Sequence, residues 1–345
     1  MPQLLPTHGG LRVAGTLVLG AMASGILLLG LMLTVPAAKE AVVTQALTVH
    51  SRLFDSPHRQ PRAKATVPVR YRAIALPPLA AGPLKLAGAW KVEADEPRFG
   101  GISALALDGA SLLALADTGV VIRLPRPGAK STDATLWDLP GGPGSPRIKE
   151  DRDSEAIAAD PLGRGWWVAF ENRDQLWLYD RTIHHPLARI EVHDPALAFN
   201  YGIEALAPMA NGLLLLPEAG QSAIALAGHR RITFPVSNGF GAVSEAAALP
   251  DGSLLLLARI VRLRGFENRL VRLVRHGDGF ETELLAQLPI GRYDNIEAMA
   301  AEPAGDGRTR IWLMTDNDLS LWRSTLLVLL EMAPMPPATG ARSHG

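Results

Sequence analysis

The chain has no cysteine among its 345 residues. This absence excludes disulfide bonds, zinc sites built on thiolates and catalysis by a cysteine nucleophile. The chain also lacks an excess of either charge, because 34 Lys and Arg residues balance 34 Asp and Glu residues. A chain without net charge has no global attraction for nucleic acid. Any electrostatic function must therefore arise from the local placement of charged side chains.

Two motifs of common enzyme classes are also absent. The sequence contains neither the G-x-S-x-G turn of typical serine hydrolases nor the G-x-x-x-x-G-K-[ST] loop that binds nucleotide phosphates. What is present is a composition with 48% hydrophobic residues, 33 Gly and 27 Pro. That composition supports a sizeable core built from many short elements joined by turns.

Uncharged residues run from Val13 to Ala38 and include the apolar stretch "LVLGAMASGILLLGLMLTV". One interpretation is an export signal cleaved near Val35–Ala37, and the other is an uncleaved membrane anchor formed by residues 13–35. We therefore assign residues 1–38 to a signal peptide or membrane anchor preceded by an N-terminal positive charge, Arg12. Either interpretation predicts an extracytoplasmic protein, periplasmic or secreted.

The remainder divides into three parts. Residues 39–66 are interrupted by proline and are predicted to be a linker. Residues 67–332 carry strand-like patterns throughout and are predicted to form the globular domain. Residues 333–345 are rich in Pro and Gly without an apolar period, which predicts a disordered tail.

A repeated phrase dominates the predicted domain. In each copy a short strand is followed by a tight turn and a second apolar strand, as in "GIEALAPMANGLLLLPEAG" (202–220) and "VSEAAALPDGSLLLLARIV" (243–261). The phrases align on Ser103, Glu155, Glu204, Glu245 and Glu297, which are 52, 49, 41 and 52 residues apart. Repeats of this length without helical periodicity predict an all-β fold, a β-propeller. We expect five or six blades and favour six, with the last blade shared between the two ends of the domain.

The aligned glutamates are expected to gather at one mouth of the propeller channel, because the first strand of each blade lines that channel. The second strands return to the same mouth and end at Asp117, Glu171, Glu218, Arg259 and Asp316. Clustered carboxylates raise one another's pKa unless water or a cation relieves the repulsion, and calcium prefers such oxygen ligands. Nearby Asp153, Asp294, Asn295 and Asp318 could add ligands. The alternative is that each glutamate only caps a turn or binds backbone amides.

Several of these phrases resemble the phytase-like propeller family, described as having esterase-like activity of phytase. "DNIEAMA", "RIWLMTDND" and "TLLVLLEM" are similar to its closing block, and "DSEAIAADPLGRGWWVAFENR" is similar to an earlier block. The resemblance covers roughly residues 85–332. The chain departs from the family pattern at Ala156 and Ala298, where glycine is usual, and in the order of Asn317 and Asp318.

The resemblance implies an exported propeller whose acidic channel mouth suits calcium. The expected metal ligands, which combine the family match with the repeat, are Glu155, Glu171, Glu204, Glu218, Glu245, Glu297, Asp316 and Asn317. The expected catalytic residues are Glu155, Glu204 and Glu297. Basic residues beside the repeats are expected to hold the substrate: Arg152, Arg173, Arg259 and Arg292.

Two functions of different classes follow from these expectations. The first is a calcium-dependent ester hydrolase, with phosphoesters as the first substrate class to test, acting at the acidic mouth on a small anionic ester. The second is a non-catalytic propeller of the cell envelope that binds a protein or glycan. We expect a monomer that does not bind nucleic acid and that touches the membrane only through an uncleaved N-terminal segment.

Overall fold

The structure is a computed structural model that describes residues 63–79, 82–146, 148–192, 197, 202–210, 212–227, 230–236, 239–320 and 323–335. These residues belong to one compact unit, Pro57–Gly345. The predicted signal or anchor, 1–38, lies outside the described residues, as do nearly all of the predicted linker and most of the predicted tail. Among the described residues, no helix combines the length and the apolar character needed to cross a bilayer.

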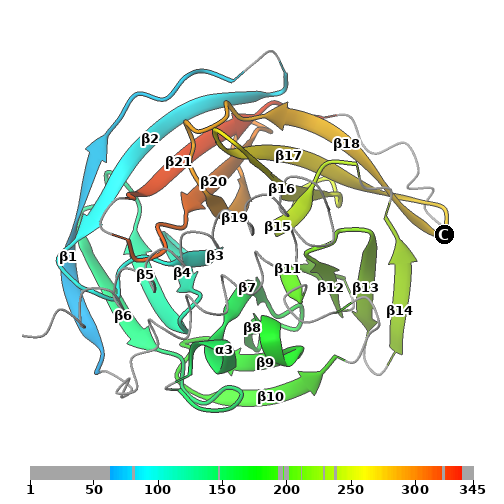
Figure 1. The fold of residues 1–345 in the computed structure, drawn as a ribbon, viewed down its shortest axis with the longest axis horizontal. Coiled ribbons are helices and arrows are strands. Elements are labelled where there is room, and N and C mark those ends of the chain that lie inside the picture. The colour runs from blue at the N-terminus through cyan, green and yellow to red at the C-terminus, as the bar shows by residue number, and fades with distance from the viewer. Residues whose placement is uncertain are drawn as a thin grey trace, which may run out of the picture. The chain divides into compact units, whose positions relative to one another are not determined.

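Four-stranded antiparallel sheets arranged around a central axis form the domain (Figure 1). Each sheet follows chain order from the inside outwards, as the repeated strand–turn–strand pattern predicts. The three separate sheets are β7 (Ser154–Ala159), β8 (Gly165–Phe170), β9 (Gln175–Asp180) and β10 (Pro186–Glu191); β11 (Ile203–Met209), β12 (Gly212–Pro217), β13 (Ser222–Ala227) and β14 (Arg230–Pro235); and β15 (Ala242–Ala248), β16 (Leu254–Arg262), β17 (Gly265–His276) and β18 (Gly279–Gln287).

Strands from both ends of the domain join in the largest sheet, which closes the ring. Its order is β19-β20-β21-β2-β1-β6-β5-β4-β3. The bounds are β1 (Ala65–Ala73), β2 (Leu84–Ala94), β3 (Ile102–Asp108), β4 (Ser111–Ala116), β5 (Val120–Pro125), β6 (Asp133–Asp138), β19 (Ile296–Pro303), β20 (Thr309–Thr315) and β21 (Thr325–Met332).

The closing contact is the antiparallel pair between β2 and β21, in which Leu84 lies opposite Met332. This pair completes a four-stranded unit, β19-β20-β21-β2, as expected for a blade shared between the two ends. Strand β1 then pairs with both β2 and β6 and so connects this unit to β3–β6. The described strands thus make five four-stranded units plus β1, and the favoured count of six blades is not confirmed.

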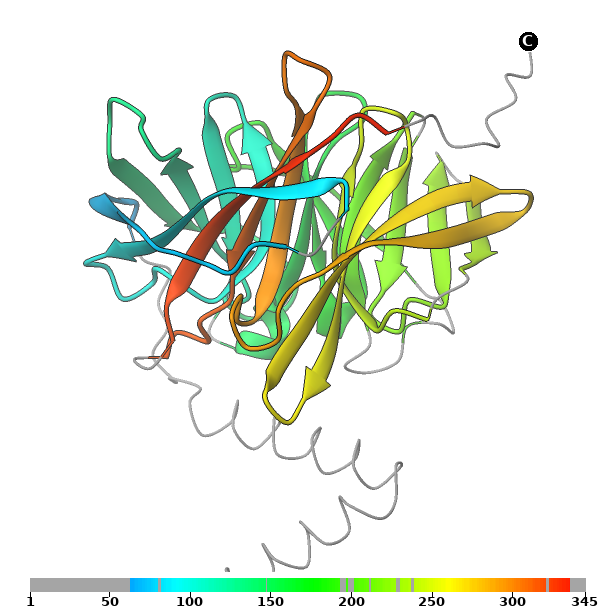
Figure 2. The same cartoon turned by 90° about the horizontal axis from the view of Figure 1, so that it is seen from above.

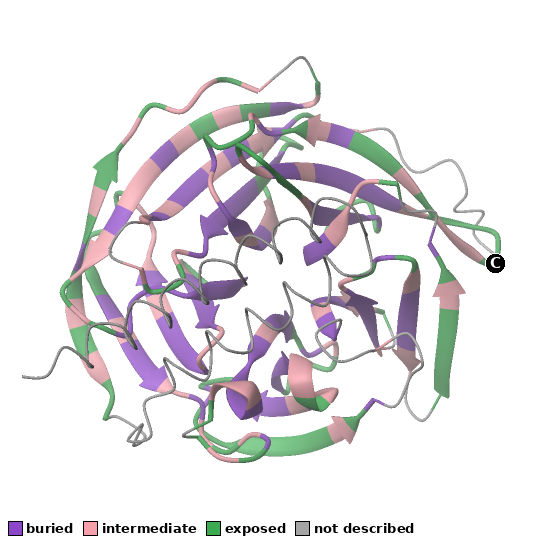
Figure 3. Cartoon of the chain, viewed as in Figure 1, coloured by how far each residue is buried: buried purple, intermediate pink, exposed green. Residues whose placement is uncertain are grey.

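The core consists of five hydrophobic clusters, each lying between neighbouring sheets of the ring (Figure 3). Inner and middle strands are apolar on both faces because each is covered by a sheet on either side. For example, Leu113 of β4 and Val168 of β8 belong to one buried cluster. The outermost strands β10 and β14 are exposed along most of their length. The apolar composition of β3, β4, β8, β12 and β16 therefore follows from their place in the fold.

Candidate metal centre at the channel mouth

Every inner strand carries a register shift at the same place. In β7 the pairing passes from Ser154↔Phe170 to Ala156↔Ala169, so Glu155 is the extra residue of a bulge. Such a bulge leaves one residue out of the ladder and redirects its side chain. The other bulges occur at equivalent positions and leave out Ser103, Glu204, Ser244 and Glu297. The repeated phrase therefore encodes a repeated backbone irregularity at one end of the channel, which we call the mouth.

A second set of side chains reaches the mouth from the strand next to each inner strand. The residue directly after β8, Glu171, donates its backbone N–H to the carbonyl of Asp153 at 2.9 Å. Three other units repeat this contact, from Asp117 to Gly101, from Glu218 to Gly202 and from Asp316 to Asn295, at 2.8–3.2 Å. In the remaining unit, Arg259 takes the position and pairs with Ala242 in register. Four carboxylates and one guanidinium thus occupy equivalent positions at the end of the second strand of each unit.

The structure brings five carboxylates into two overlapping groups of three. Asp153, Glu155 and Glu171 have carboxylate oxygens within 4.8 Å of one another, and so do Glu171, Glu204 and Glu218. Glu171 belongs to both groups. Its close approach to the next unit requires glycine at 202, because a Cβ there would lie 2.5 Å from Glu171 Cγ. These oxygens could hold a metal ion.

Burial and mutual repulsion shift these groups in the same direction. Desolvation, followed by the charges of Asp153 and Glu218, raises the pKa of Glu171 to about 8. The pKa values of Glu155 and Glu204 are raised well above the ordinary range, first by desolvation and then by neighbouring carboxylates. The pKa of Glu218 is also raised by desolvation, against the opposing charge of Arg259. The mouth therefore disfavours the ionised carboxylates in the absence of a compensating cation.

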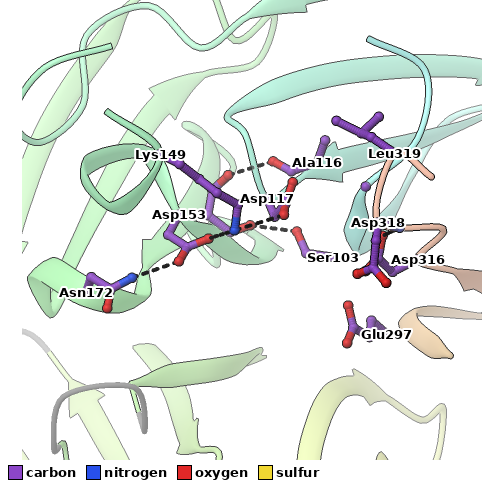
Figure 4. A network of polar contacts seen from close by, with 12 residues as sticks. Ser103, Ala116, Asp117, Lys149, Asp153, Asn172, Glu297, Asp316, Asp318 and Leu319 are labelled. Carbon is purple, nitrogen blue, oxygen red and sulfur yellow. Dashed lines mark hydrogen bonds and ion pairs between the residues drawn. The ribbon is translucent and has the colours of Figure 1, made fainter. Parts of the chain in front are cut away.

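Two basic side chains of the chain already enter this acidic region. Lys149, in the short helix α3 (Lys149–Arg152), places Nζ 3.0 Å from both Asp117 Oδ2 and Asp153 Oδ1 (Figure 4). Asn172 of η1 (Glu171–Arg173) donates to the other oxygen of Asp153 at 2.7 Å. Asp153 is therefore held from two sides. Lys149 keeps its proton because the charges of Asp117, Asp153 and Glu155 outweigh the desolvation that lowers its pKa.

Arg259 neutralises the other side of the mouth. It donates to Glu297 and, at 2.8 Å, to Asn295 Oδ1, while Asn295 Nδ2 donates to Glu297 Oε1 at 2.9 Å. Its pKa is raised because the charges of Glu297, Glu204 and Glu218 outweigh its desolvation. Glu297 is thus engaged by the protein itself, whereas Glu155 and Glu204 lie in the two metal-competent groups.

Asp316 and Asn317 lie apart from the two groups. Desolvation, followed by the Glu297 charge and a hydrogen bond with Asp318, raises the pKa of Asp316 to about 10. Asn317 Oδ1 accepts from the backbone N–H groups of Gly101 at 2.9 Å and Leu319 at 3.2 Å. This amide oxygen therefore holds two loops together by binding backbone amides. That is the structural role which the sequence left open as the alternative to metal binding.

Glu245 differs from its predicted position by one residue. The bulge in β15 leaves out Ser244, and Glu245 pairs with Leu257 where other inner strands have alanine. Its carboxylate is 1% exposed and accepts from Ala246 N–H at 2.9 Å. It is not part of either group of three. The correct alignment is visible in the sequence, because Val243-Ser244 corresponds to Ile102-Ser103, with an apolar residue before the bulge.

Because the Glu245 carboxyl is buried, we expect the substitution Glu245→Gln to change the stability of the fold in a pH-dependent way. Desolvation raises the pKa of Glu245 well above 4.5, against the backbone amides of Ala246 and Leu105. A raised acid pKa gives a contribution to stability that is complete below pH 4.5 and is lost as the pH rises towards the folded-state value. The uncharged Gln removes this loss. Denaturant unfolding should therefore show the variant gaining on the wild type by about 1 kcal/mol or more between pH 5 and pH 9. A difference in unfolding free energy between variant and wild type that stays constant across this pH range would contradict the raised pKa of Glu245.

The predicted substrate-binding arginines are distributed differently from expectation. Arg152 is 7% exposed, and a Cβ at Gly142, whose φ is +109°, would lie 2.0 Å from Arg152 Nη1. Arg173 is half exposed and pairs with Asp151. Arg292 is exposed in the loop before β19. Of the four, only Arg259 contacts the carboxylates of the mouth. Asn172 was missed by sequence reasoning, although it directly follows the Glu171 of the repeat.

No curated protein matched. Solved structures that resemble the fold include a glutaminyl cyclase from Myxococcus xanthus (10% identity, 77% of this chain and 99% of that chain, TM-score 0.43). They also include a virginiamycin B lyase from Staphylococcus aureus (10% identity, 78% of this chain and 76% of that chain, TM-score 0.39). A third is a nidogen/laminin complex (12% identity, 79% of this chain and 100% of that chain, TM-score 0.43). Similarity at this level carries no information on function.

A family model described as "Esterase-like activity of phytase" matches residues 97–319, which are 223 of the 345 residues of the chain. The matched range begins before β3 and ends after Asp316, so it includes both groups of carboxylates. The chain belongs to this phytase-like family.

Proposed function

We propose that the chain is a calcium-dependent ester hydrolase that acts on small phosphoesters at the mouth. One observation carries this proposal, namely the two overlapping carboxylate groups that share Glu171. We further propose that the propeller works outside the cytoplasm as a monomer, exported or anchored through residues 13–35. The family membership supports the class of protein, while the activity, the metal and the location are our inference.

Calcium fits the donor set at the mouth. All five clustered side chains offer hard oxygen ligands, and calcium takes six to eight oxygens in flexible geometry. Asp153, Glu155 and Glu171 would hold one ion, or Glu171, Glu204 and Glu218 would hold it. When bound, calcium supplies positive charge that neutralises the carboxylates and attracts an anionic ester.

The side chains at the mouth then divide into distinct roles. One ion would occupy only one of the two groups, so either Glu155 or Glu204 would remain outside it. That glutamate, once the bound cation lowers its raised pKa and leaves it ionised, is the candidate to accept a proton from the attacking water. Glu297 is fixed by Arg259 and Asn295, so we assign it to positioning. Arg173 and Arg292 are sufficiently exposed to contact peripheral phosphates. Arg152 is buried, and we assign it to the support of α3.

The proposal predicts calcium-dependent hydrolysis of a chromogenic phosphomonoester. Activity should disappear with a chelator, return with calcium, and fall at least a hundredfold in Glu204→Gln, consistent with the loss of a general base. Glu281→Gln is the matched control, because Glu281 is 64% exposed on the outer strand β18. Equal activity of both variants would remove Glu204 from the mechanism. Binding of calcium without hydrolysis of phosphate or carboxylate esters would favour the non-catalytic cell-envelope alternative.

A further inference from the structure

The hairpin between β16 and β17 projects beyond the other strands at the mouth. Its ladder continues past Arg259 to the pair Arg262↔Gly265, leaving Leu263 and Arg264 as the turn. Figure 2 shows this hairpin extending below the sheets, on the side where α3 lies. Leu263 is fully exposed and Val261 is 74% exposed. Two large apolar side chains are thus presented to solvent at the end of an ordered hairpin.

A neighbouring loop enlarges this surface. Gly291 donates its N–H to Phe266 O at 3.4 Å, and a Cβ at Gly291 would lie 2.6 Å from Arg264 O. The loop is therefore packed directly against the hairpin. It contributes Ile290, which is 40% exposed, and the exposed Arg292. We call the combined surface the rim patch: Val261, Leu263, Arg264, Ile290 and Arg292.

The charge of the surrounding region is basic. Arg262 and Arg269 both pair with the buried Glu267, so two positive charges share one negative charge. The exposed Asp318 is paired with Arg323, which lies over the ring of Phe266 at 5.6 Å. Apolar side chains flanked by arginines are suited to the interface of an anionic bilayer, where the apolar groups enter the headgroup region and the guanidinium groups contact phosphates.

The first described residue, Ala63, lies on the face of the propeller that contains the mouth. Ala63 O accepts from Arg98 Nη2 at 3.3 Å, and Arg98 lies 3.6 Å from Asp138. Asp138 is opposite Val120, the first residue after the turn that follows Asp117. Residue 63 therefore lies on the side of the propeller from which the hairpin projects.

We propose that the rim patch docks on an anionic membrane surface, with Leu263 and Val261 in the headgroup region and Arg264 and Arg292 on lipid phosphates. This contact orients the mouth towards the bilayer. None of the five residues belongs to the carboxylate groups, and Arg292 alone is shared with the proposed contacts to substrate phosphates, so the membrane contact is tested without measuring hydrolysis.

The absence of cysteine makes the test direct, because a single introduced thiol carries the only label. The full chain would be prepared as Leu263→Cys and Leu162→Cys, each labelled with a polarity-sensitive fluorophore, and reconstituted into lipid nanodiscs. Leu162 is 74% exposed in the β7–β8 turn at the end of the sheet away from the mouth, which makes it the matched control. The discs would contain phosphatidylcholine alone or equal parts phosphatidylcholine and phosphatidylglycerol.

We expect the label at 263 to shift to the blue and to be quenched by nitroxide lipids in the anionic discs, at least several-fold more than in neutral discs. The label at 162 should report water in both. Adding Arg264→Glu and Arg292→Glu should abolish the response at 263, with an unchanged thermal midpoint showing that the fold is intact. A water-like signal at 263 in anionic discs, equal responses at 263 and 162, or equal responses in both disc types would overturn the proposal.

Discussion

Arg259→Met is expected to lower the free energy of unfolding of the calcium-free chain by about 3 kcal/mol, the scale for removing one partner from a buried ion pair. Arg259 is the only mouth residue at its repeat position that is not acidic, and it is bound by Glu297 and Asn295. Methionine retains much of the packing volume but leaves Glu297, Glu204 and Glu218 without the charge that opposes their repulsion. Denaturant unfolding in the presence of a chelator measures this loss.

Arg308→Met provides the control for that experiment. Arg308 pairs with Asp306 and Glu331 on the exposed turn at the other end of β20, where solvent screens the charges. We expect a much smaller loss there. Calcium should restore more stability to Arg259→Met than to the wild type, because an added cation can replace part of the missing charge. A loss equal to that of Arg308→Met would show that the guanidinium is not needed to balance the mouth.

Unlike Arg259→Met, Glu171→Gln is not expected to lower the free energy of unfolding of the calcium-free chain. It is expected to weaken calcium binding strongly. Glu171 belongs to both groups of three, and its pKa of about 8 reflects burial and the charges of Asp153 and Glu218. The amide cannot acquire the repelled charge that Glu171 gains as the pH approaches 8, so the calcium-free variant should be at least as stable as the wild type. It also removes a ligand shared by both groups, so calcium affinity should fall tenfold or more, which is about 1.4 kcal/mol or more.

The measurement for Glu171→Gln is the shift in thermal midpoint over a calcium titration, since stabilisation by a ligand follows its concentration relative to Kd. Glu245→Gln is the matched control, because Glu245 is also a glutamate whose pKa is raised by desolvation but lies in neither group. We expect its calcium response to equal that of the wild type. An unchanged response in Glu171→Gln, or a reduced response in Glu245→Gln, would require a different ligand set.

Much of the fold could be predicted because the repeat reflects a backbone constraint. Each aligned glutamate or serine marks a bulge, and Ser103, Glu155, Glu204 and Glu297 occupy equivalent places. The strand that follows returns to the mouth, so Glu171, Glu218 and Arg259 could be placed as well. The error at Glu245 arose because adjacent Ser and Glu both fit the phrase, and only the register of β15 distinguishes them.

Other features depend on tertiary contacts that have no local signature. The position of Lys149 between Asp117 and Asp153 is set by α3, a four-residue helix in an otherwise irregular loop. The burial of Arg152 goes with its approach to Gly142 within the irregular segment that connects β6 to β7. Strand β1, which pairs with two neighbouring units, could not be assigned to either one from its alternating pattern alone.

The most direct test of the central claim is calorimetric titration of the chelator-treated chain with calcium near neutral pH, in two buffers of different ionisation enthalpy. Because burial raises the pKa of Glu171 to about 8 and those of Glu155 and Glu204 well above the ordinary range, binding must displace protons from the mouth. The account predicts saturable binding whose heat depends on the buffer, showing proton release. Absence of binding, or binding without proton release that persists in Glu171→Gln, would contradict it.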